Sequence, residues 1–215
     1  MSIAAESKGR GNRPAEFPTH RGRQTQAAID AAARTVIARK GILATTIADI
    51  AAEAGRSAAS FYNYYDSKEA MVRQWAMRFR DEANERAGSV TGHGLSDRER
   101  AHEAAAAHWH TYRNRLAEVI SVSQLAMVND DFAQYWAEIC DIPISFIADT
   151  VRRAQAKGYC AGDDPQLIAE AIVAMFNQFC YVQLSRADSD ALDDQACIQT
   201  LANIYYRAIY SKEGG

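Results

Sequence analysis

Apolar residues recur along this chain at spacings of three and four positions, the pattern of helices that bury one face. No stretch shows the alternation of apolar and polar residues that is typical of strands. Only 4 of the 215 residues are proline, and alanine, a strong helix former, is abundant. The pattern therefore predicts an all-α protein, long enough to bury a substantial core.

Capping residues and glycines mark where these helices begin and end. Thr45 or Thr46 is expected to cap a helix, with Asp49 completing a variant of the capping box, and Gly41 suits the end of the preceding helix. Pro143 falls inside a long helical pattern, which it should kink or break. The expected helices cover 24–40, 46–54, 58–64, 67–86, 96–113, 115–128, 130–157, 163–186 and 192–210.

The segment 45–71 contains two short helical patterns separated by Gly55 and Arg56. This is the layout of a helix-turn-helix, whose second helix enters the major groove of double-stranded DNA. Such a helix presents small or polar side chains to base edges and hydrogen-bond donors to phosphates, while Phe61 and Tyr65 are expected to pack inward. The candidate contact residues are Thr46, Ser57, Ala58, Ala59, Ser60, Tyr62, Asn63, Tyr64 and Lys68.

Charge is distributed unevenly along the chain. Residues 1–80 carry 13 Lys and Arg against 7 Asp and Glu, and residues 81–215 carry 11 against 20, within a net charge of −3. The basic first third is the part suited to meet a polyanion, although charge also varies by chance between small domains. Residues 1–22 read as a flexible basic arm or a tail without a role, and Arg21 and Arg23 are candidates for phosphate contact.

The run from Arg23 to Met71 resembles the DNA-binding domain of the TetR family of transcriptional regulators. The residues that carry the resemblance are Gly41, Thr45 to Ala51, Ala54, Gly55, Ser57, Phe61, Tyr62, Tyr64, Tyr65, Ser67, Lys68 and Glu69. The resemblance places Thr46, Ala58, Ala59, Ser60, Tyr62, Tyr64 and Lys68 at DNA-contact positions. Arg56 departs from the aliphatic residue usual after the turn glycine. The Asn63-Tyr64-Tyr65 run also departs from the family pattern, so base preference does not carry over.

The resemblance implies a division of the chain into a basic arm (1–22), a helix-turn-helix domain (23–66), a connecting helix (67–88) and a helical effector-binding and dimerisation domain (89–215). It also implies a homodimer on a palindromic operator, since two-fold symmetry gives one recognition helix per half-site. The expected function is a repressor released by a small hydrophobic effector. The alternative is a DNA-binding regulator or architectural protein without an effector, and an activator role stays open.

The second domain concentrates aromatic residues in helices that are expected to pack together. An apolar pocket with a few polar groups suits a hydrophobic effector, although an aromatic stripe at helical spacing is more often simply core. Asn177, in mid-helix among apolar neighbours, is the foremost polar candidate. The candidate effector contacts are Trp109, Tyr112, Gln124, Met127, Trp136, Phe146, Phe176, Asn177 and Phe179. The run 175–179 with Trp109 and Trp136 resembles the EthR-like branch of the family.

The last two helices are expected to form the dimer interface. The segment 163–184 is apolar on more than one face, as is usual for a helix buried in an interior or an interface. Its apolar positions include Ala169, Ile172, Val173, Phe176, Cys180 and Leu184, and those of the last helix are Ile198, Leu201, Ile204, Tyr205 and Ile209. We therefore expect a two-fold interface of four helices.

Other classes of protein are disfavoured by the sequence. No nucleophile motif or phosphate-binding glycine pattern occurs, so we do not expect an enzyme or a cofactor. His108 and His110 point to different sides of a helix, which disfavours a metal site. The four cysteines lack CxxC spacing and are expected to be core thiols in the cytoplasm. Neither a signal peptide nor a membrane span is expected.

Overall fold

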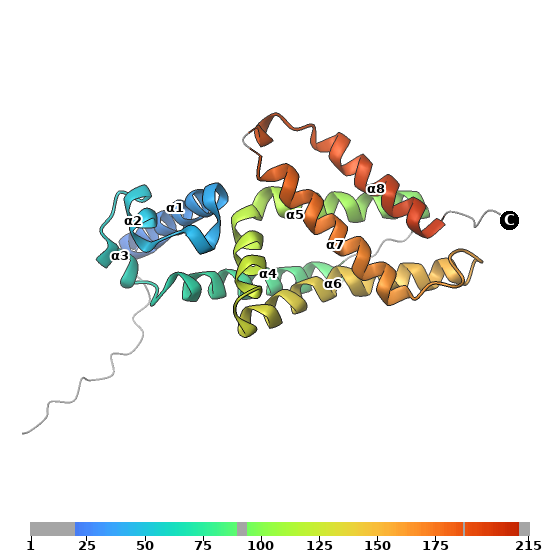
Figure 1. The fold of residues 1–215 in the computed structure, drawn as a ribbon, viewed down its shortest axis with the longest axis horizontal. Coiled ribbons are helices and arrows are strands. Elements are labelled where there is room, and N and C mark those ends of the chain that lie inside the picture. The colour runs from blue at the N-terminus through green and yellow to red at the C-terminus, as the bar shows by residue number, and fades with distance from the viewer. Residues whose placement is uncertain (1–19, 90–93, 187, 211–215) are drawn as a thin grey trace, which may run out of the picture.

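The computed structural model describes residues 20–89, 94–186 and 188–210, and all regular structure within these ranges is helical (Figure 1). The all-α prediction is confirmed. The elements are α1 (His20–Ala44), α2 (Ile47–Glu53), α3 (Ala58–Tyr62), α4 (Lys68–Ser89), α5 (Asp97–Ala126), α6 (Asp130–Gln155), α7 (Pro165–Leu184), the short 3₁₀ helix η1 (Ser189–Ala191) and α8 (Asp194–Tyr210).

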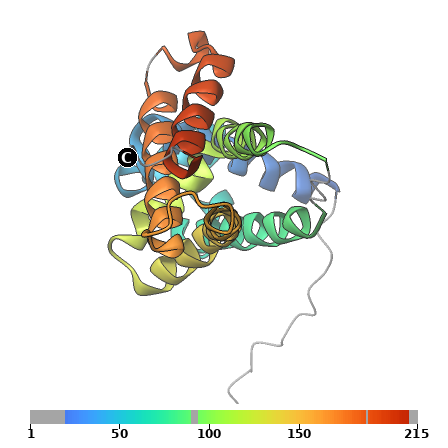
Figure 2. The ribbon, with the colours of Figure 1, turned by 90° about the vertical axis from the view of Figure 1, so that its right-hand side faces the viewer.

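The helices α1, α2 and α3 gather at one end of an elongated molecule, and α7 and α8 lie toward the other end (Figure 1). The helix α4 leads from the first group toward the second. The view at right angles shows α7 and α8 on the same side of α5 (Figure 2). Two distinct groups of helices are therefore joined through α4 and α5.

Two hydrophobic clusters form the core, and α5 contributes to both. One cluster joins α1–α4 to the second half of α5 through residues such as Ile29, Ile42, Trp75 and Leu125. The other joins the first half of α5 to α6, α7 and α8 around Trp109. Because the first cluster also contains Phe132 of α6, the helix-turn-helix group is packed against the second domain rather than tethered to it by a linker.

Several helix boundaries differ from those expected. The helix α1 begins at His20, so Arg21 and Gly22 lie in a helix and not in the arm. The helix α5 is continuous where two helices were expected, but Arg115 has non-helical dihedral angles (φ −135°, ψ 29°) beside the expected boundary. Pro143 was expected to kink or break the helix, and α6 continues through it without a break. A proline removes only one backbone hydrogen bond, and α6 is packed into the core on both sides of this point.

The apolar residues expected to form the dimer interface are mostly core residues of the single protomer. The buried ones are Ala169, Ile172, Val173, Phe176, Cys180, Leu184, Ile198, Leu201, Tyr205 and Ile209, whereas Ile204 is exposed. A different row of α7 residues faces outward, with Leu167, Tyr181 and Val182 as its large apolar members. The periodicity had correctly marked two apolar faces on α7, but it could not tell which one the protomer itself covers.

By length and composition alone, α7 could cross a membrane. Its mean hydropathy over 18 residues is 1.4. This is weak evidence, because a core helix passes the same test, and the inward face of α7 packs into the cluster around Trp109.

Candidate DNA-binding surface and effector region

The start of α2 is fixed by a complete capping box. The Asp49 backbone N–H donates to Thr46 Oγ1 at 3.1 Å, and the Thr46 backbone N–H donates to Asp49 Oδ2 at 2.8 Å. Lys40 Nζ donates to the same carboxylate oxygen at 2.6 Å, and this bond, together with those from Thr46, holds the Asp49 pKa far below its usual range. The Thr46 hydroxyl itself donates to Asp49 at 2.6 Å, so a phosphate would have to compete for its proton.

The helix α3 presents the surface that the sequence analysis assigned to DNA. Ser57 caps it by accepting a hydrogen bond from the Ser60 backbone N–H at 3.3 Å. The exposed candidates are Ser57, Ala58, Ala59, Tyr62 and Asn63, whereas Ser60 and Tyr64 are half-buried. The Tyr62 side chain is 56% exposed. A low-bulk first turn followed by phenol and amide groups is therefore available to a DNA groove.

The inward face of the same segment anchors α3 to α1. Phe61 and Tyr65 are buried, as expected. The Tyr65 hydroxyl donates to Asp30 Oδ1 at 2.6 Å and accepts from Gln26 Nε2 at 3.1 Å. Burial and the bond to Asp30 raise the Tyr65 pKa to about 12, so this tyrosine keeps its proton and the anchor at neutral pH.

An open cleft of about 340 Å³ lies between the start of α1 and the α2–α3 turn. Its lining residues are Arg21, Gly22, Thr25, Arg56, Ser60 and Tyr64. In the part of the chain that the structure describes, no carboxylate forms a salt bridge with the Arg21 or Arg56 guanidinium. Two unneutralised guanidinium groups beside hydroxyl groups provide a site suited to a phosphate. Arg56, which the sequence analysis left unassigned, thus joins the candidates, whereas Arg23 is absent from this lining.

Lys68 has a different role from the expected phosphate contact. Its ammonium group donates to the backbone carbonyls of Ile42 and Thr45, both at 2.8 Å, and of Leu43 at 3.5 Å. These three acceptors use the three hydrogens of the ammonium group. Lys68 therefore ties the start of α4 to the end of α1. Local sequence patterns could not predict these contacts, because Lys68 is more than 20 positions away from these carbonyls along the chain.

Five of the proposed effector residues meet in the second domain. Trp109, Tyr112 and Phe176 are buried, and Phe179 and Asn177 are half-buried beside them. The Trp109 and Phe179 rings lie 6.2 Å apart, and His108 joins the group, its ring 5.2 Å from that of Tyr112 and 5.3 Å from that of Phe176. His108 had been considered only as a metal ligand. Among the described residues, no metal-binding cluster of His, Cys, Asp or Glu is found.

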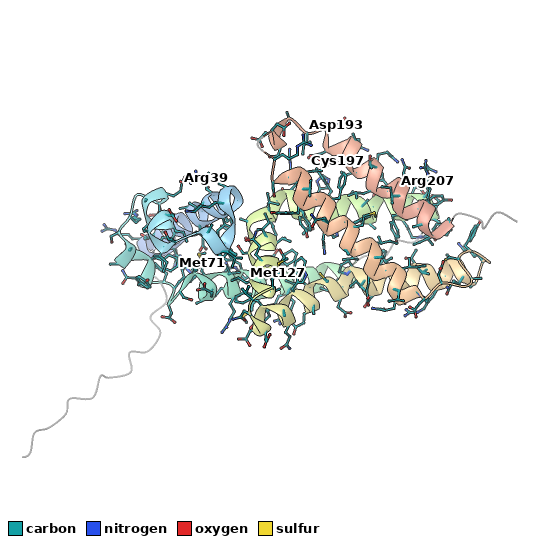
Figure 3. All side chains as sticks on the ribbon, in the orientation of Figure 1. Arg39, Met71, Met127, Asp193, Cys197 and Arg207 are labelled. Carbon is teal, nitrogen blue, oxygen red and sulfur yellow. The ribbon has the colours of Figure 1, made fainter. Side chains whose placement is uncertain are left out.

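The remaining effector candidates lie elsewhere. Met127 lies at the corner between α5 and α6 (Figure 3) and is 81% exposed. Phe146 of α6 is 42% exposed. Trp136 is half-buried and packs against both hydrophobic clusters. Gln124 Oε1 accepts a hydrogen bond from the Ile42 backbone N–H at 3.1 Å, so this side chain contacts the helix-turn-helix group. Helical spacing predicted burial for these positions but carried no information about the neighbouring helix.

A polar junction connects α1 and α4 to the middle of α5. Glu118 is only 8% exposed and accepts from Arg34 at 2.9 Å and from Arg115 at 3.3 Å. Arg115 also pairs with Glu82 of α4, and the Arg34 guanidinium lies over the Trp75 ring at 5.0 Å. The non-helical residue of α5 is thus itself a member of the junction, which follows His108 and Tyr112 along α5 and is paired with α1 and α4.

Comparison with known proteins shows what part of the chain is similar to. Residues 29–74 match the family described as bacterial regulatory proteins of the tetR family. Along 134 residues the chain is 28% identical to the HTH-type transcriptional repressor KstR2 of Rhodococcus jostii (strain RHA1). That match covers 56% of this chain and 64% of the relative, so the chain spans less than two thirds of its length.

Solved structures share the fold along most of the chain. A regulatory protein of the tetR family from Rhodococcus RHA1 has a TM-score of 0.68 at 17% identity, covering 88% of this chain and 99% of that one. FadR from Bacillus subtilis in complex with stearoyl-CoA has a TM-score of 0.60 at 18% identity, covering 86% and 100%. At these identities the solved structures show a shared fold, while the match of residues 29–74 and the repressor relative indicate similarity to the tetR family of bacterial regulatory proteins. The EthR-like branch is not confirmed by these comparisons.

Proposed function

We propose that this protein is a sequence-specific transcriptional regulator that binds a palindromic operator as a homodimer in the cytoplasm and acts as a repressor released by a small hydrophobic effector. The observation that carries the proposal is the outward surface of α3 beside the cleft of Arg21 and Arg56. The match to the tetR family and the similarity to a transcriptional repressor support it.

The DNA-binding half of the proposal combines base reading with phosphate contact. Ala58 and Ala59 offer methyl groups to thymine but no hydrogen bonds, so discrimination between bases falls to Tyr62, Asn63 and DNA shape. The guanidinium groups of Arg21 and Arg56 would hold the backbone beside the groove. Such contacts fix register and orientation and make affinity strongly dependent on salt.

The effector half rests on the position of the aromatic group relative to the junction. His108 and Tyr112 lie on α5 shortly before Arg115, and Glu118 and Gln124 follow it. A ligand that separates the rings of α5 and α7 would shift the first half of α5 relative to the second. Through the pair Arg34–Glu118, that shift changes the orientation of α1 and so the spacing of two recognition helices. This is linkage, in which the ligand favours a conformation that mismatches the operator.

The test begins with selection of a binding site from random double-stranded DNA. The wild type and the Arg21→Ala plus Arg56→Ala double variant are then titrated with the selected duplex at several salt concentrations. Each lost phosphate contact should reduce the slope of log affinity against log salt by about 0.9. The control is Arg152→Ala, an exposed arginine of α6 paired with Asp149, for which we expect no change. Failure to select any site, or an affinity independent of salt, would contradict the proposal.

A further inference from the structure

His108 carries a buried hydrogen-bonding atom that nothing in the described part of the protein satisfies. Its Nε2 is buried and has no hydrogen-bond partner. The ring is held between Tyr112, with which it stacks, and Phe176, which it meets edge to face. Burial lowers the His108 pKa to about 4, so the imidazole is neutral at pH 7. An unsatisfied polar atom in such a place needs a physical explanation.

The neighbouring Asn177 engages the other nitrogen of the ring. Its Nδ2 donates to Cys140 Sγ at 3.7 Å, and its side chain also forms a hydrogen bond with His108, which raises the His108 pKa. Because Nε2 has no partner, that bond is made at Nδ1. In a neutral imidazole Nε2 is an acceptor in one tautomer and an N–H donor in the other. A hydroxyl group can satisfy either, since it both donates and accepts.

The surroundings of Nε2 restrict what can satisfy it. Aromatic rings of α5 and α7 lie on either side of the imidazole, and Trp109 Nε1–H on the same helix is a second buried group without a partner among the described residues. No charged group contributes to the His108 pKa. An ionised carboxylate would lose its hydration there without a counter-charge. A neutral hydroxyl on an apolar body has the matching chemistry.

We propose that the effector site of this protein lies at His108 and takes a neutral, largely apolar molecule whose hydroxyl group forms a hydrogen bond with His108 Nε2. The inference rests on the proposed function, because it specifies the effector of that regulator. Phe176, Phe179 and Tyr112 contact the apolar body, and Asn177 holds the other nitrogen of the imidazole.

The experiment compares two probes of nearly equal shape, 2-naphthol and 2-methylnaphthalene. Binding to the full-length protein is measured by calorimetry and by the shift in thermal unfolding temperature. We expect 2-naphthol to bind the wild type about tenfold more tightly, since a hydrogen bond to a buried, unpartnered ring nitrogen contributes roughly one factor of ten. His108→Phe should remove this preference while retaining an aromatic ring. The matched control, His110→Phe, changes an exposed histidine of the same helix and should preserve it.

Three outcomes would overturn the inference: equal affinity of the wild type for the two probes, binding of neither, or an undiminished preference in a folded His108→Phe variant. The comparison of probes on the wild type alone remains decisive if that variant does not fold. Binding of the selected operator is measured on the same samples. Operator binding without a hydroxyl preference rejects this inference and leaves the regulator intact, whereas no operator binding rejects the proposed function itself.

Discussion

Gly41 is subject to two separate constraints at the end of α1. Its φ of 76° and ψ of 162° lie in a region that essentially only glycine adopts. A Cβ atom there would also lie 2.7 Å from Gln124 Oε1, the atom that accepts the hydrogen bond from the Ile42 backbone N–H. The glycine therefore permits both the turn and the close approach of α5.

We expect Gly41→Ala to destabilise the protein by about 2–4 kcal/mol, because backbone strain of about 1–3 kcal/mol is combined with displacement of Gln124. The matched control is Gly55→Ala, at a glycine with φ of 60° and no atom within 4 Å of the added carbon. That variant reports backbone strain alone and should cost less. Urea unfolding of the two variants measures the difference, and equal losses would show that the Gln124 contact contributes nothing.

At the scale of single residues, the sequence predicted contacts between residues that are close together along the chain. Thr46 was one of two residues expected to cap α2, with Asp49 three positions later completing the capping box, and the structure contains those bonds. Gly41 was expected to end α1, and it does leave the helical region. Its second constraint could not be predicted, since Gln124 is 83 positions away and reaches it only through the packing of α5.

At the scale of elements, the contacts of α4 show that this helix is fixed to both α1 and α6. Lys68 places a cation at its amino terminus, which the helix dipole disfavours, but the carbonyls at the end of α1 offset that cost. Further along, Arg80 pairs with Glu138 of α6 at 3.1 Å, and Trp75 lies under Arg34. The helix is thus held at its start by α1 and along its length by the second domain.

Lys68→Met should therefore lower the stability of the fold rather than remove a phosphate contact. We expect a loss of about 2 kcal/mol, since hydrogen bonds to a charged group are broken and carbonyls at the end of α1 lose their donor. Affinity for the selected operator should fall while the salt slope is unchanged. Arg56→Met is the contrasting variant and should reduce the slope with little loss of stability. A reduced slope for Lys68→Met would restore the original assignment of Lys68 to DNA.

The bounds of helices were predicted well where apolar periodicity and capping residues agree. They were predicted less well where packing against other helices determines whether a helix continues. The helices α7 and α8 were expected near their observed bounds because Asp164 and Pro165 form a clear start signal and the apolar spacing is sustained. Pro143 was expected to interrupt α6, but tertiary contacts on both sides carry the helix through it. In α5 the non-helical Arg115 lies at the junction with Glu82 and Glu118, which no local pattern encodes.

At the scale of the whole molecule, the candidate DNA surface and the aromatic group lie in different groups of helices but share α5. A hydrophobic cluster and the pair Arg34–Glu118 both cross between them. Sequence reasoning assigned the two groups separately, and the uneven charge had indicated only that the basic first third is suited to meet a polyanion. The shared core instead makes the orientation of α1 to α3 dependent on α5, as an effector-controlled regulator requires.

The outward row of α7 predicts where two copies of the chain meet. Leu167 is 65% exposed and Val182 is 47% exposed, and Tyr181 lies beside them on α7 with Ile204 of α8 also exposed. Exposed large apolar residues along one helix are typical of an interface, and a two-fold axis would place this row against its own copy. This row, and not the buried residues that periodicity first indicated, is our candidate for the dimer interface.

Leu167→Glu combined with Val182→Glu should convert the dimer to a monomer in light scattering, while helical content by circular dichroism stays unchanged. Met127→Glu is the control, because that side chain is 81% exposed at the α5–α6 corner, away from this row. A monomer loses the effective concentration that joins two half-sites, so affinity for the palindromic operator should fall about 100-fold. Affinity for an isolated half-site should stay the same, since α3 and its cleft are untouched. A double variant that remains dimeric would place the interface on another surface of the protein.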